Sequence, residues 1–412
     1  MTDTPWESWS AADIEPRVHR TVTFRFEKNE YRFALSQDLF SSHEIDTGSR
    51  LLLAELQTQN PGPVSSVYDI GCGVGVLGIV AASEYSAQRL VLEDRDALAV
   101  RFAARNAAEN GLPCQADAFC RPAGAAGCAY PEHDLVLSNV PAKAGEPVRR
   151  ALLSHALASC RSTGVFVSVL VQPLADETER MLHDIGVSDL HRINHAGHAV
   201  FLARPAPDGP SVQGSDGQAS YRRGSSVNHN LEQVQLAAQP YWGLGEFETP
   251  SFQTGMALKL IDSLEADRHL VIWNPGVGIV PAWCRKKYTA RQCTFASDDS
   301  LQILATVDTL QRNRSRRTRM PLSTLLSPSV QTLHACMPDR SALILVLDAA
   351  ITPGQRGEID ELCRLLGERD CVLLVAGHSG EVSRFERQPW ASVVRRSRSR
   401  GLRGMVLRIR QR

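Results

Sequence analysis

The sequence predicts an α/β protein made of two tandem doubly wound sheets, the first preceded by a β-hairpin. Three observations lead to this prediction. Strand-like and helix-like segments alternate through the first half, which is typical of a parallel sheet covered by helices on both faces. The second half repeats this pattern. The chain has 412 residues, which is more than a single hydrophobic core normally holds.

The first predicted elements form the hairpin. Residues 22–26 and 31–35 alternate apolar and polar side chains, and a polar turn separates them. A helical stretch follows over residues 48–56. The next predicted elements are strands over 67–70, 89–92, 134–137 and 165–171, and helices over 97–110 and 147–160. Their order predicts a sheet of mostly parallel strands.

A polar segment divides the chain. From Pro205 to about Gln239 the sequence consists largely of Pro, Gly, Ser, Gln and Asn, with almost no apolar periodicity. Such a composition buries too little apolar surface to offset the entropy lost on ordering. We therefore predict a first domain over residues 1–205, a flexible linker over 206–239 and a second domain over 240–412.

The second half is interpreted as an internal duplication. Residues 69–110 align with residues 272–313 without a gap, so that two glycines, Gly73 and Gly75, fall on Gly276 and Gly278. Residues 40–48 resemble residues 247–255, and residues 134–137 correspond to residues 344–347. This last alignment places Asn139 on Ala349.

Composition excludes several classes of protein. Lys plus Arg is 45 and Asp plus Glu is 45, so bulk charge alone does not drive nucleic-acid binding. No apolar run is long enough to cross a bilayer, and the first 13 residues lack a basic and apolar signal. Ten cysteines without a C-x-x-C pair fit neither a disulfide framework nor a zinc knuckle. We expect a cytoplasmic protein without a metal or a membrane span.

Polar residues follow the predicted strands of the first half. The glycine-rich loop that begins at Asp69 closes one strand, and Asp94, Asp117 and Asn139 follow or end the next ones. Ligands of open α/β sheets gather at the carboxyl ends of strands, where a carboxylate such as Asp94 can accept both hydroxyls of a ribose. Asp69 and the lack of a third glycine favour a ligand with a ribose and a charged amine over a dinucleotide. Asp117 could accept from an adenine amine or simply cap its loop.

These residues resemble a known family. Residues 69–73 are similar to motif I of class I S-adenosylmethionine-dependent methyltransferases, and closer still to the "methyltransferase small" group, which contains the rRNA guanine-N2 methyltransferases. The resemblance covers residues 22–204, half of the chain. It includes residues 40–52, Asp94, residues 106–112, residues 138–145 and residues 198–202.

The resemblance implies two tandem Rossmann-like methyltransferase folds and S-adenosylmethionine as the cofactor. Asp69 and the turn of Gly71, Gly73 and Gly75 would hold its methionine part. Asp94 would bind the ribose and Asp117 the adenine amine.

The resemblance also implies a catalytic loop. Asn139 and Pro141 would form it, and the Asn139 side chain would accept a hydrogen bond from the amine that is methylated. The sequence departs from the family's Asn-Pro-Pro-aromatic pattern, because Val140 replaces the first proline and Ala142 replaces the residue that stacks on the base. Ala142 cannot supply a stacking contact, so Phe119 or a residue of the second half would have to replace it.

The second half lacks these polar groups. In the aligned repeat, Ile272 replaces Asp69, Asn274 replaces Gly71 and Ser297 replaces Asp94. It is instead rich in arginine, with five between residues 312 and 319 and eight between residues 395 and 412. Arginine forks suit phosphates, so these stretches predict contact with RNA, although a solvated face would have the same composition.

The leading hypothesis is an S-adenosylmethionine-dependent RNA methyltransferase, acting on an exocyclic amine of rRNA, with guanine-N2 as the acceptor. The first half would be active, and the second would be a degenerate copy that holds RNA. Two alternatives are a protein or small-molecule N-methyltransferase and a non-catalytic RNA-binding protein. The internal pair favours a monomer.

Overall fold

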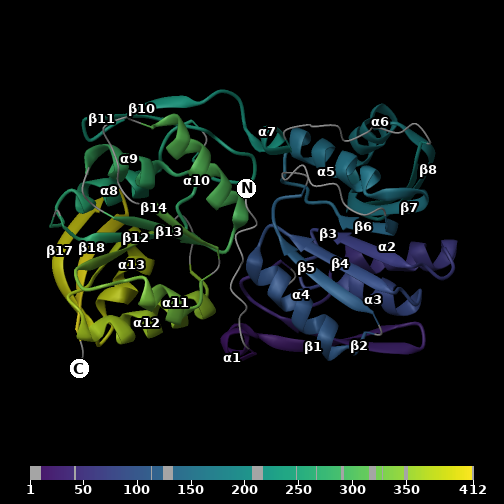
Figure 1. Cartoon of the computed structure of the whole chain (residues 1–412), viewed down its shortest axis with the longest axis horizontal. Coiled ribbons are helices and arrows are strands. Elements are labelled where there is room, and N and C mark those ends of the chain that lie inside the picture. Colours follow the sequence, from purple (N-terminus) through teal and green to yellow (C-terminus); the bar gives the residue numbers. More distant parts are fainter. Residues whose placement is uncertain are drawn as a thin grey trace. The chain divides into compact units, whose positions relative to one another are not determined.

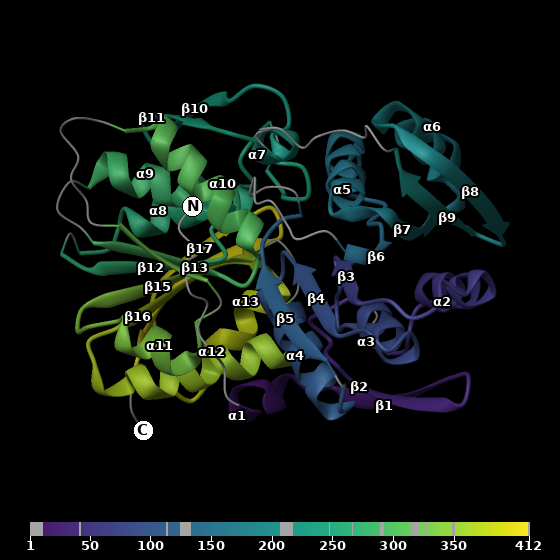
Figure 2. The same cartoon turned by 45° about the vertical axis from the view of Figure 1, so that its right-hand side comes forward.

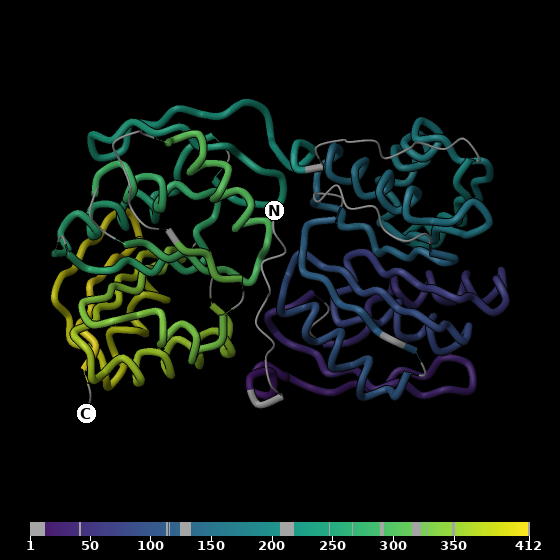
Figure 3. Tube along the Cα trace, in the orientation of Figure 1, coloured from purple at the N-terminus to yellow at the C-terminus, as the bar shows by residue number. Residues whose placement is uncertain are grey.

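The chain folds into two compact units, Ser10–Tyr221 and Arg222–Arg412 (Figures 1 and 3). A computed structural model describes residues 11–40, 43–112, 114–123, 133–206, 217–246, 248–265, 267–288, 292–314, 322–326, 328–347 and 351–410. Each unit contains one seven-stranded sheet covered by helices, so the predicted fold class is confirmed. Within the described ranges, no helix has the length and apolar character that a membrane crossing requires.

The first unit holds the predicted hairpin and the first sheet. Its helices are α1 Ala11–Ile14, α2 Thr47–Gln59, α3 Val76–Glu84, α4 Ala97–Glu109, α5 Glu146–Ala158, α6 Ala175–Ile185 and α7 Gly217–Tyr221. Its strands are β1 Arg20–Phe26, β2 Asn29–Leu35, β3 Ser66–Ile70, β4 Arg89–Asp94, β5 Gln115–Cys120, β6 His133–Asn139, β7 Cys160–Val171, β8 Val187–His195 and β9 His198–Pro205. Every strand and helix predicted for this half is present, within a few residues of its expected bounds.

The first sheet has the order β5-β4-β3-β6-β7-β9-β8. Strands β3 to β7 are parallel, whereas β9 lies antiparallel between β7 and β8. Helices α5 and α6 cover one face, and α2, α3 and α4 cover the other (Figure 2). All five residues of β3 are buried, as expected for a central strand covered on both faces. The carboxyl ends of β3, β4 and β6 therefore meet at one edge.

Asn106 of α4 and Asn110, the C-cap of this helix, fasten the hairpin to the sheet. The Asn106 side chain accepts a hydrogen bond from Ala34 N (2.9 Å) and donates to the carbonyls of Ala34 (3.2 Å) and Val74 (2.9 Å). Asn110 forms the same reciprocal pair with the backbone of Arg32. Asn106 is fully buried, so three backbone groups depend on it. The hairpin and the loop after β3 are thus held by one side chain.

The second unit repeats the first. Its helices are α8 Phe252–Ile261, α9 Ile279–Lys287, α10 Ser300–Arg312, α11 Val330–Ala335, α12 Pro353–Leu365 and α13 Ser379–Glu386. Its strands are β10 Val227–Leu231, β11 Val234–Ala238, β12 His269–Trp273, β13 Cys293–Ser297, β14 Leu322–Leu326, β15 Ser341–Leu347, β16 Val372–His378, β17 Ala391–Ser399 and β18 Leu402–Ile409. Their order in the sheet, β14-β13-β12-β15-β16-β18-β17, matches that of the first sheet strand for strand.

The predicted linker differs from the structure over its second part. Residues 207–216 lie outside the described residues, but β10 and β11 form an antiparallel hairpin within residues 227–238. Asn313, the C-cap of α10, bonds Ala237 N (3.0 Å) and Ala237 O (2.6 Å), as Asn110 bonds Arg32. The hairpin is thus the second copy of β1–β2. Composition did not reveal it, because distant side chains such as Trp283, which donates to Leu231 O, hold it in place.

Two details of the sequence alignment also require correction. The N-caps of α2 and α8 are Asp46 and Ser251. The sequence offset between these two helices is therefore two residues shorter than the offset between residues 40–48 and residues 247–255. Strand pairing then sets the position that matches Asn139. Asp69 pairs with Leu137, and Ile272 pairs with Ile344, so Val346 rather than Ala349 corresponds to Asn139. A short apolar run defines a strand but not its register.

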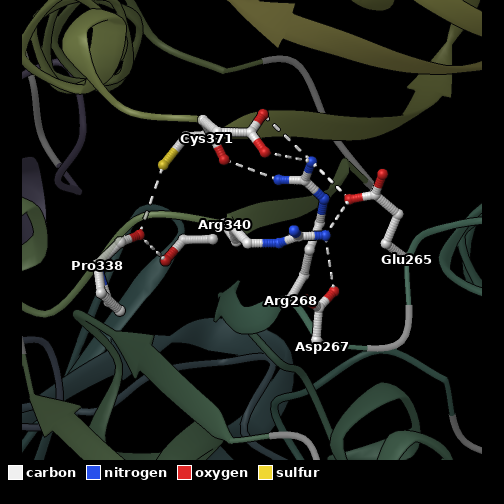
Figure 4. Close-up of polar contacts among 8 residues, drawn as sticks. Glu265, Asp267, Arg268, Pro338, Arg340 and Cys371 are labelled. Carbon is white, nitrogen blue, oxygen red and sulfur yellow. Dashed lines mark hydrogen bonds and ion pairs between the residues drawn. The ribbon is translucent and has the colours of Figure 1, made fainter.

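Ion pairs join the strand beginnings of the second sheet (Figure 4). Arg268 is almost fully buried and bonds both the backbone and the carboxylate of Asp370 (2.8 and 3.1 Å). Arg340 pairs with Glu265 (2.9 Å) and Asp267 (3.0 Å). A buried guanidinium needs such partners to offset the loss of hydration. These charges satisfy one another at the edge opposite the carboxyl ends, so the network is structural.

Candidate functional site

The loop between β3 and α3 presents backbone to open space. Gly71 and Gly73 have φ of +72° and +55°, which side chains rarely adopt, and no described atom lies within 4 Å of where their Cβ would be. Gly71 N and Cys72 N donate to the carbonyl of Glu93 at 2.8 and 2.9 Å. Gly75 instead lies against α4, because a Cβ there would be 3.2 Å from the Cα of Ala103. The loop is therefore anchored at its ends and open in the middle.

Asp94 stands beside this loop at the end of β4. Its Oδ2 accepts from Gly73 N and its Oδ1 from Asp96 N, both at 3.0 Å. The carboxylate is half-buried, and burial raises its pKa while the two N–H donors oppose that rise. Two hydrogen bonds fix the carboxylate next to the open backbone of Gly71 and Gly73, where a ligand's hydroxyls can reach it.

Asp69 lies beneath the loop and is fully buried. Its Oδ2 accepts from Gly78 N (2.8 Å) in the first turn of α3, and Oδ1 has no hydrogen-bond partner among the described residues. Burial raises the pKa of Asp69 to about 7, and the Asp94 charge adds to that rise. A buried carboxylate oxygen without a donor is costly, and a cationic ligand group bound directly or through water would offset the cost.

Asp117 does not join this edge. It pairs with Val91 in the middle of β4, three positions before Asp94, and its carboxylate bonds the Arg89 guanidinium at 3.1 Å. The expectation that Asp117 follows its strand therefore differs from the structure, in which β5 continues to Cys120. No bounds were predicted for this strand, so the sequence did not locate its end. Phe119, which is 37% exposed, lies nearer the edge, beneath the Arg121 guanidinium (4.9 Å).

Asn139 ends β6, and its amide is oriented by Asp46. The Asn139 Nδ2 donates to Asp46 Oδ1 at 2.9 Å, and Asp46 also accepts from Ser49 N and Ser49 Oγ. Because a carboxylate only accepts, Nδ2 must face Asp46. The Asn139 Oδ1 is then turned away, and no described residue donates to it. Pro141 follows on the surface, next to the exposed Ala142.

Sequence reasoning missed Asp46 as a site residue. Asp46 entered the sequence analysis only as part of residues 40–52, which carry the family resemblance, and the structure shows it as the N-cap of α2. Its second role depends on a contact across 93 positions of sequence. The available signals were a carboxylate at a helix N-cap and an asparagine at a strand end. Only the fold brings the two together.

The second unit has different groups at the matching positions. Asn274 takes the place of Gly71 with a φ of +55°, and its side chain accepts from Ser297 Oγ at 2.9 Å. Ile272 is buried at the position of Asp69, and Val346 stands at that of Asn139. The polar groups present there bond one another rather than facing open space.

Metal-ligating side chains do not gather in the parts of the chain that the structure describes. No group of three His, Cys, Asp or Glu residues there could hold an ion. The polar groups at the edge are instead backbone N–H groups, the carboxylates of Asp46, Asp69 and Asp94, and the amide of Asn139. Such a set suits an organic ligand with hydroxyls and amines.

Comparisons with known proteins identify similar chains. Residues 30–189 match the model of the methyltransferase small domain. The chain is 28% identical over 149 residues to the uncharacterized protein YbxB of Bacillus subtilis, which covers 35% of this chain and 71% of that protein. It is 38% identical over 104 residues to the ribosomal RNA small subunit methyltransferase C of Pseudomonas aeruginosa, with 24% of this chain and 30% of that protein covered.

A solved structure extends the likeness over both units. A 16S rRNA N2 guanine methyltransferase of T. thermophilus, solved with AdoMet and guanosine, superposes with a TM-score of 0.66 at 14% identity. The match covers 96% of this chain and 99% of that one. The two proteins share the fold. In sequence, by contrast, the chain spans less than a third of the rRNA methyltransferase from P. aeruginosa.

We predict that Asp69→Asn removes a pH dependence of stability. The pKa of Asp69 is about 7 in the folded chain and about 3.9 in an unfolded chain. Between these values the folded state binds the extra proton, so the wild-type free energy of unfolding falls as pH rises. Relative to the variant, the wild type should lose up to about 1.4 kcal/mol per pH unit. Urea denaturation followed by circular dichroism from pH 4.5 to 7.5 measures this slope.

The control is Asp189→Asn, which removes an exposed carboxylate of β8. It should keep the wild-type slope. Parallel slopes for the wild type and Asp69→Asn would contradict the burial argument.

Proposed function

We propose that this chain, whose residues 30–189 belong to the methyltransferase small domain family, is an S-adenosylmethionine-dependent methyltransferase that acts on an exocyclic base amine of rRNA, guanine-N2 in particular. The observation that carries the proposal is the orientation of Asn139. Asp46 binds its Nδ2, so Oδ1 is left as an acceptor at the sheet edge. An amine with hydrogens to donate is the group that this atom can bind.

S-adenosylmethionine, the methyl donor, fits the edge formed by β3 and β4. The open backbone of Gly71 and Gly73 suits the methionine part, and the unpartnered Oδ1 of Asp69 suits its ammonium, directly or through water. Asp94 is held where it can accept from the ribose hydroxyls. The chemistry supplied with S-adenosylmethionine is a methyl group on a positively charged sulfur. Asp117 is paired with Arg89, so we do not retain it as the adenine ligand.

The chain's own contribution to catalysis is positioning. Asn139 accepts one hydrogen of the amine and so aims its nitrogen lone pair, and Pro141 shapes the turn that follows. A correctly oriented pair of reactants removes several kcal/mol of barrier, on the order of 7 or more in favourable cases. The partly buried Asp46–Ser49–Asn139 hydrogen bonds fix this orientation before the acceptor binds.

Names and folds of relatives support RNA as the acceptor. The relatives at 38% identity are named as ribosomal RNA methyltransferases, and the structure that matches both units was solved with guanosine. We further propose that the protein works in the cytoplasm. We propose a monomer, because one chain already carries two copies of the fold.

The second unit would hold RNA through its edge strand. Arg395, Arg398 and Arg400 are exposed on β17 and its turn, and none of the three forms an ion pair with a described residue. Arg400 also lies 5.5 Å from the ring of Phe252, an aromatic side chain that is 68% exposed. Arginines beside an open aromatic face suit phosphates and bases. Most of the other cluster, between residues 312 and 319, lies outside the described residues.

Asp94→Ala should weaken S-adenosylmethionine binding by about 100-fold, the loss expected for two hydrogen bonds to a charged acceptor. Isothermal titration calorimetry on the full chain measures it. Asp117→Ala is the matched control and should bind like the wild type. Unchanged affinity in Asp94→Ala would refute the ribose assignment, and no binding by the wild type would refute the enzyme.

Asp46→Asn should lower kcat at least tenfold while leaving donor affinity unchanged. Asparagine is as good an N-cap as aspartate, so α2 keeps its start. The amide introduced at position 46 can donate as well as accept, so the Asn139 side chain no longer has one preferred orientation. Methyl transfer to in vitro transcribed 16S and 23S rRNA gives kcat. Asp299→Asn, at the N-cap of α10, should retain full activity, and equal kcat in both variants would contradict the role of Asp46.

The double variant Arg395→Gln/Arg398→Gln should flatten the salt dependence of rRNA binding. Each lost phosphate contact reduces the slope of log K against log salt by about 0.7 for a single strand, so the two together should reduce it by about 1.4. A filter-binding titration between low and moderate salt measures the slope. Arg364→Gln on α12 should not change it. An unaltered slope in the double variant would place the RNA elsewhere.

A further inference from the structure

The second unit carries an exposed aromatic ring with an arginine over it. Phe252 is the first residue of α8 and is 68% exposed, although most of the residues that follow it in this helix are buried. The guanidinium of Arg400, in the turn between β17 and β18, lies 5.5 Å from the centre of the ring. An arginine at this distance covers one face of an aromatic ring. The large exposed fraction shows that most of the remaining ring surface is in contact with solvent.

The turn that carries Arg400 has a backbone conformation that favours other residues. Ser399 pairs with Leu402, so Arg400 and Gly401 form a two-residue turn, with φ of +49° and +79°. Turns in which both residues have positive φ usually carry asparagine or aspartate followed by glycine. An arginine with positive φ costs stability. Such a cost, at an exposed position, indicates a role for the Arg400 side chain besides closing the hairpin.

A hydrogen bond anchors this turn in the same way in both units. Ser379 N donates to Gly401 O at 3.1 Å, as Gln172 N donates to Gly197 O at 2.9 Å in the first unit. The β17–β18 turn is therefore the counterpart of the β8–β9 turn. The Ser379 hydroxyl donates to the same carbonyl at 2.8 Å. Arg400 thus belongs to an anchored turn, so its guanidinium can bind a ligand without a large loss of backbone entropy.

Phe252 has a counterpart beside the proposed acceptor position. The N-caps of α2 and α8 correspond, so Phe252 occupies the position of Thr47 in the first unit. Thr47 follows Asp46, whose carboxylate binds the Asn139 amide at 2.9 Å. The ring therefore stands at the edge of the second sheet that matches the acceptor edge of the first. Val346 takes the place of Asn139 there, so this edge can bind a base but lacks the group that aims an amine.

The strand beside this turn carries an excess of positive charge. Arg398, two positions before Arg400, pairs directly with Arg403, and like charges so placed repel each other. Glu386 of α13 pairs with Arg396 and, at 3.0 Å, with Arg403, so one negative charge is shared by two guanidiniums. Arg398 is exposed and forms no ion pair with a described residue. A phosphate would supply the negative charge that is lacking.

We propose that Phe252 and Arg400 form a binding site for one unpaired base of RNA, which stacks on the open surface of the Phe252 ring. The inference rests on the proposed function, because it takes RNA as the partner. Arg398 binds a phosphate next to the stacked base. Every base has a flat face, so stacking tolerates any sequence, but the base must lie outside a duplex. The second unit therefore selects single-stranded segments of the RNA that the first unit methylates.

The first test compares single-stranded and double-stranded RNA. A short, fluorescently labelled RNA of mixed sequence is titrated with the full chain, as a single strand and as a duplex, and anisotropy gives the affinities. Phe252→Leu removes the flat ring but keeps an apolar side chain. It should weaken single-strand binding about fivefold or more, the loss of one stacked base, and leave duplex binding unchanged. Phe252→Tyr keeps a ring and should match the wild type, as should the control Leu365→Ala, at a position of α12 that is 40% exposed.

The second test uses Arg400→Asn to separate binding from folding. Asparagine is favoured at the first position of this turn, so the variant should unfold at the same urea concentration as the wild type or a higher one. The guanidinium over the ring is lost, so single-strand binding should weaken about threefold. Urea denaturation followed by circular dichroism gives the midpoint of unfolding. A lower midpoint together with unchanged single-strand affinity would mean that Arg400 is only structural.

Three other outcomes would overturn the inference. Wild-type single-strand affinity in Phe252→Leu means that the ring holds no base. Equal losses for the single strand and the duplex mean that this surface binds phosphates alone. If the wild type binds neither RNA, the surface serves a partner other than RNA. Failure of the proposed function is detected separately, because the binding tests need no S-adenosylmethionine. A chain that binds the single strand through Phe252 but methylates neither 16S nor 23S rRNA retains this site without the enzyme activity.

Discussion

The site depends on hydrogen bonds that bind the glycine loop to β4. The carbonyl of Glu93 takes the N–H groups of Gly71 and Cys72, and the carboxylate of Asp94 takes that of Gly73. Without them, three successive N–H groups at a buried strand end would lack partners, at a cost of about 1–3 kcal/mol each. The bonds also set the distance between the loop and the Asp94 carboxylate. Asn106 extends this control to the hairpin by bonding Val74 O.

The second unit retains the backbone hydrogen bonds of this loop but replaces the carboxylate acceptor. Asn274 N donates to Ala296 O at 2.8 Å, as Gly71 N does to Glu93 O. Gly276 N donates to the Gln302 side chain at 3.0 Å, where Gly73 N uses Asp94. The backbone donor remains satisfied, now by a neutral amide from α10. The second copy of the fold can therefore lack the carboxylate of Asp94 without leaving this backbone N–H unpaired.

Local signals predicted most of the fold and part of the site. Helix α4 begins at its N-cap Asp96, and the alternation of strand and helix patterns predicts the order of these elements along the chain. Glycine spacing identified the loop, and Asp94 lies where the strand end placed it. The sequence did not predict the register of the strands or the contacts between residues far apart in the chain. Asp117 lies three residues before the edge, Val346 rather than Ala349 matches Asn139, and the β10–β11 hairpin depends on Asn313.

The two units differ most sharply at the residue below the loop. In the first, the fully buried Asp69 has one oxygen without a partner among the described residues, and burial raises its pKa to about 7. Near neutral pH, part of the chain's stability is thus lost to an uncompensated carboxylate. In the second unit, the apolar Ile272 occupies the same position, so no buried carboxylate lowers the stability there. A cation bound above Asp69 would restore the charged form and recover that stability. Binding of a cationic ligand would therefore be coupled to stability in the first unit through Asp69, a coupling that the second unit's isoleucine cannot provide.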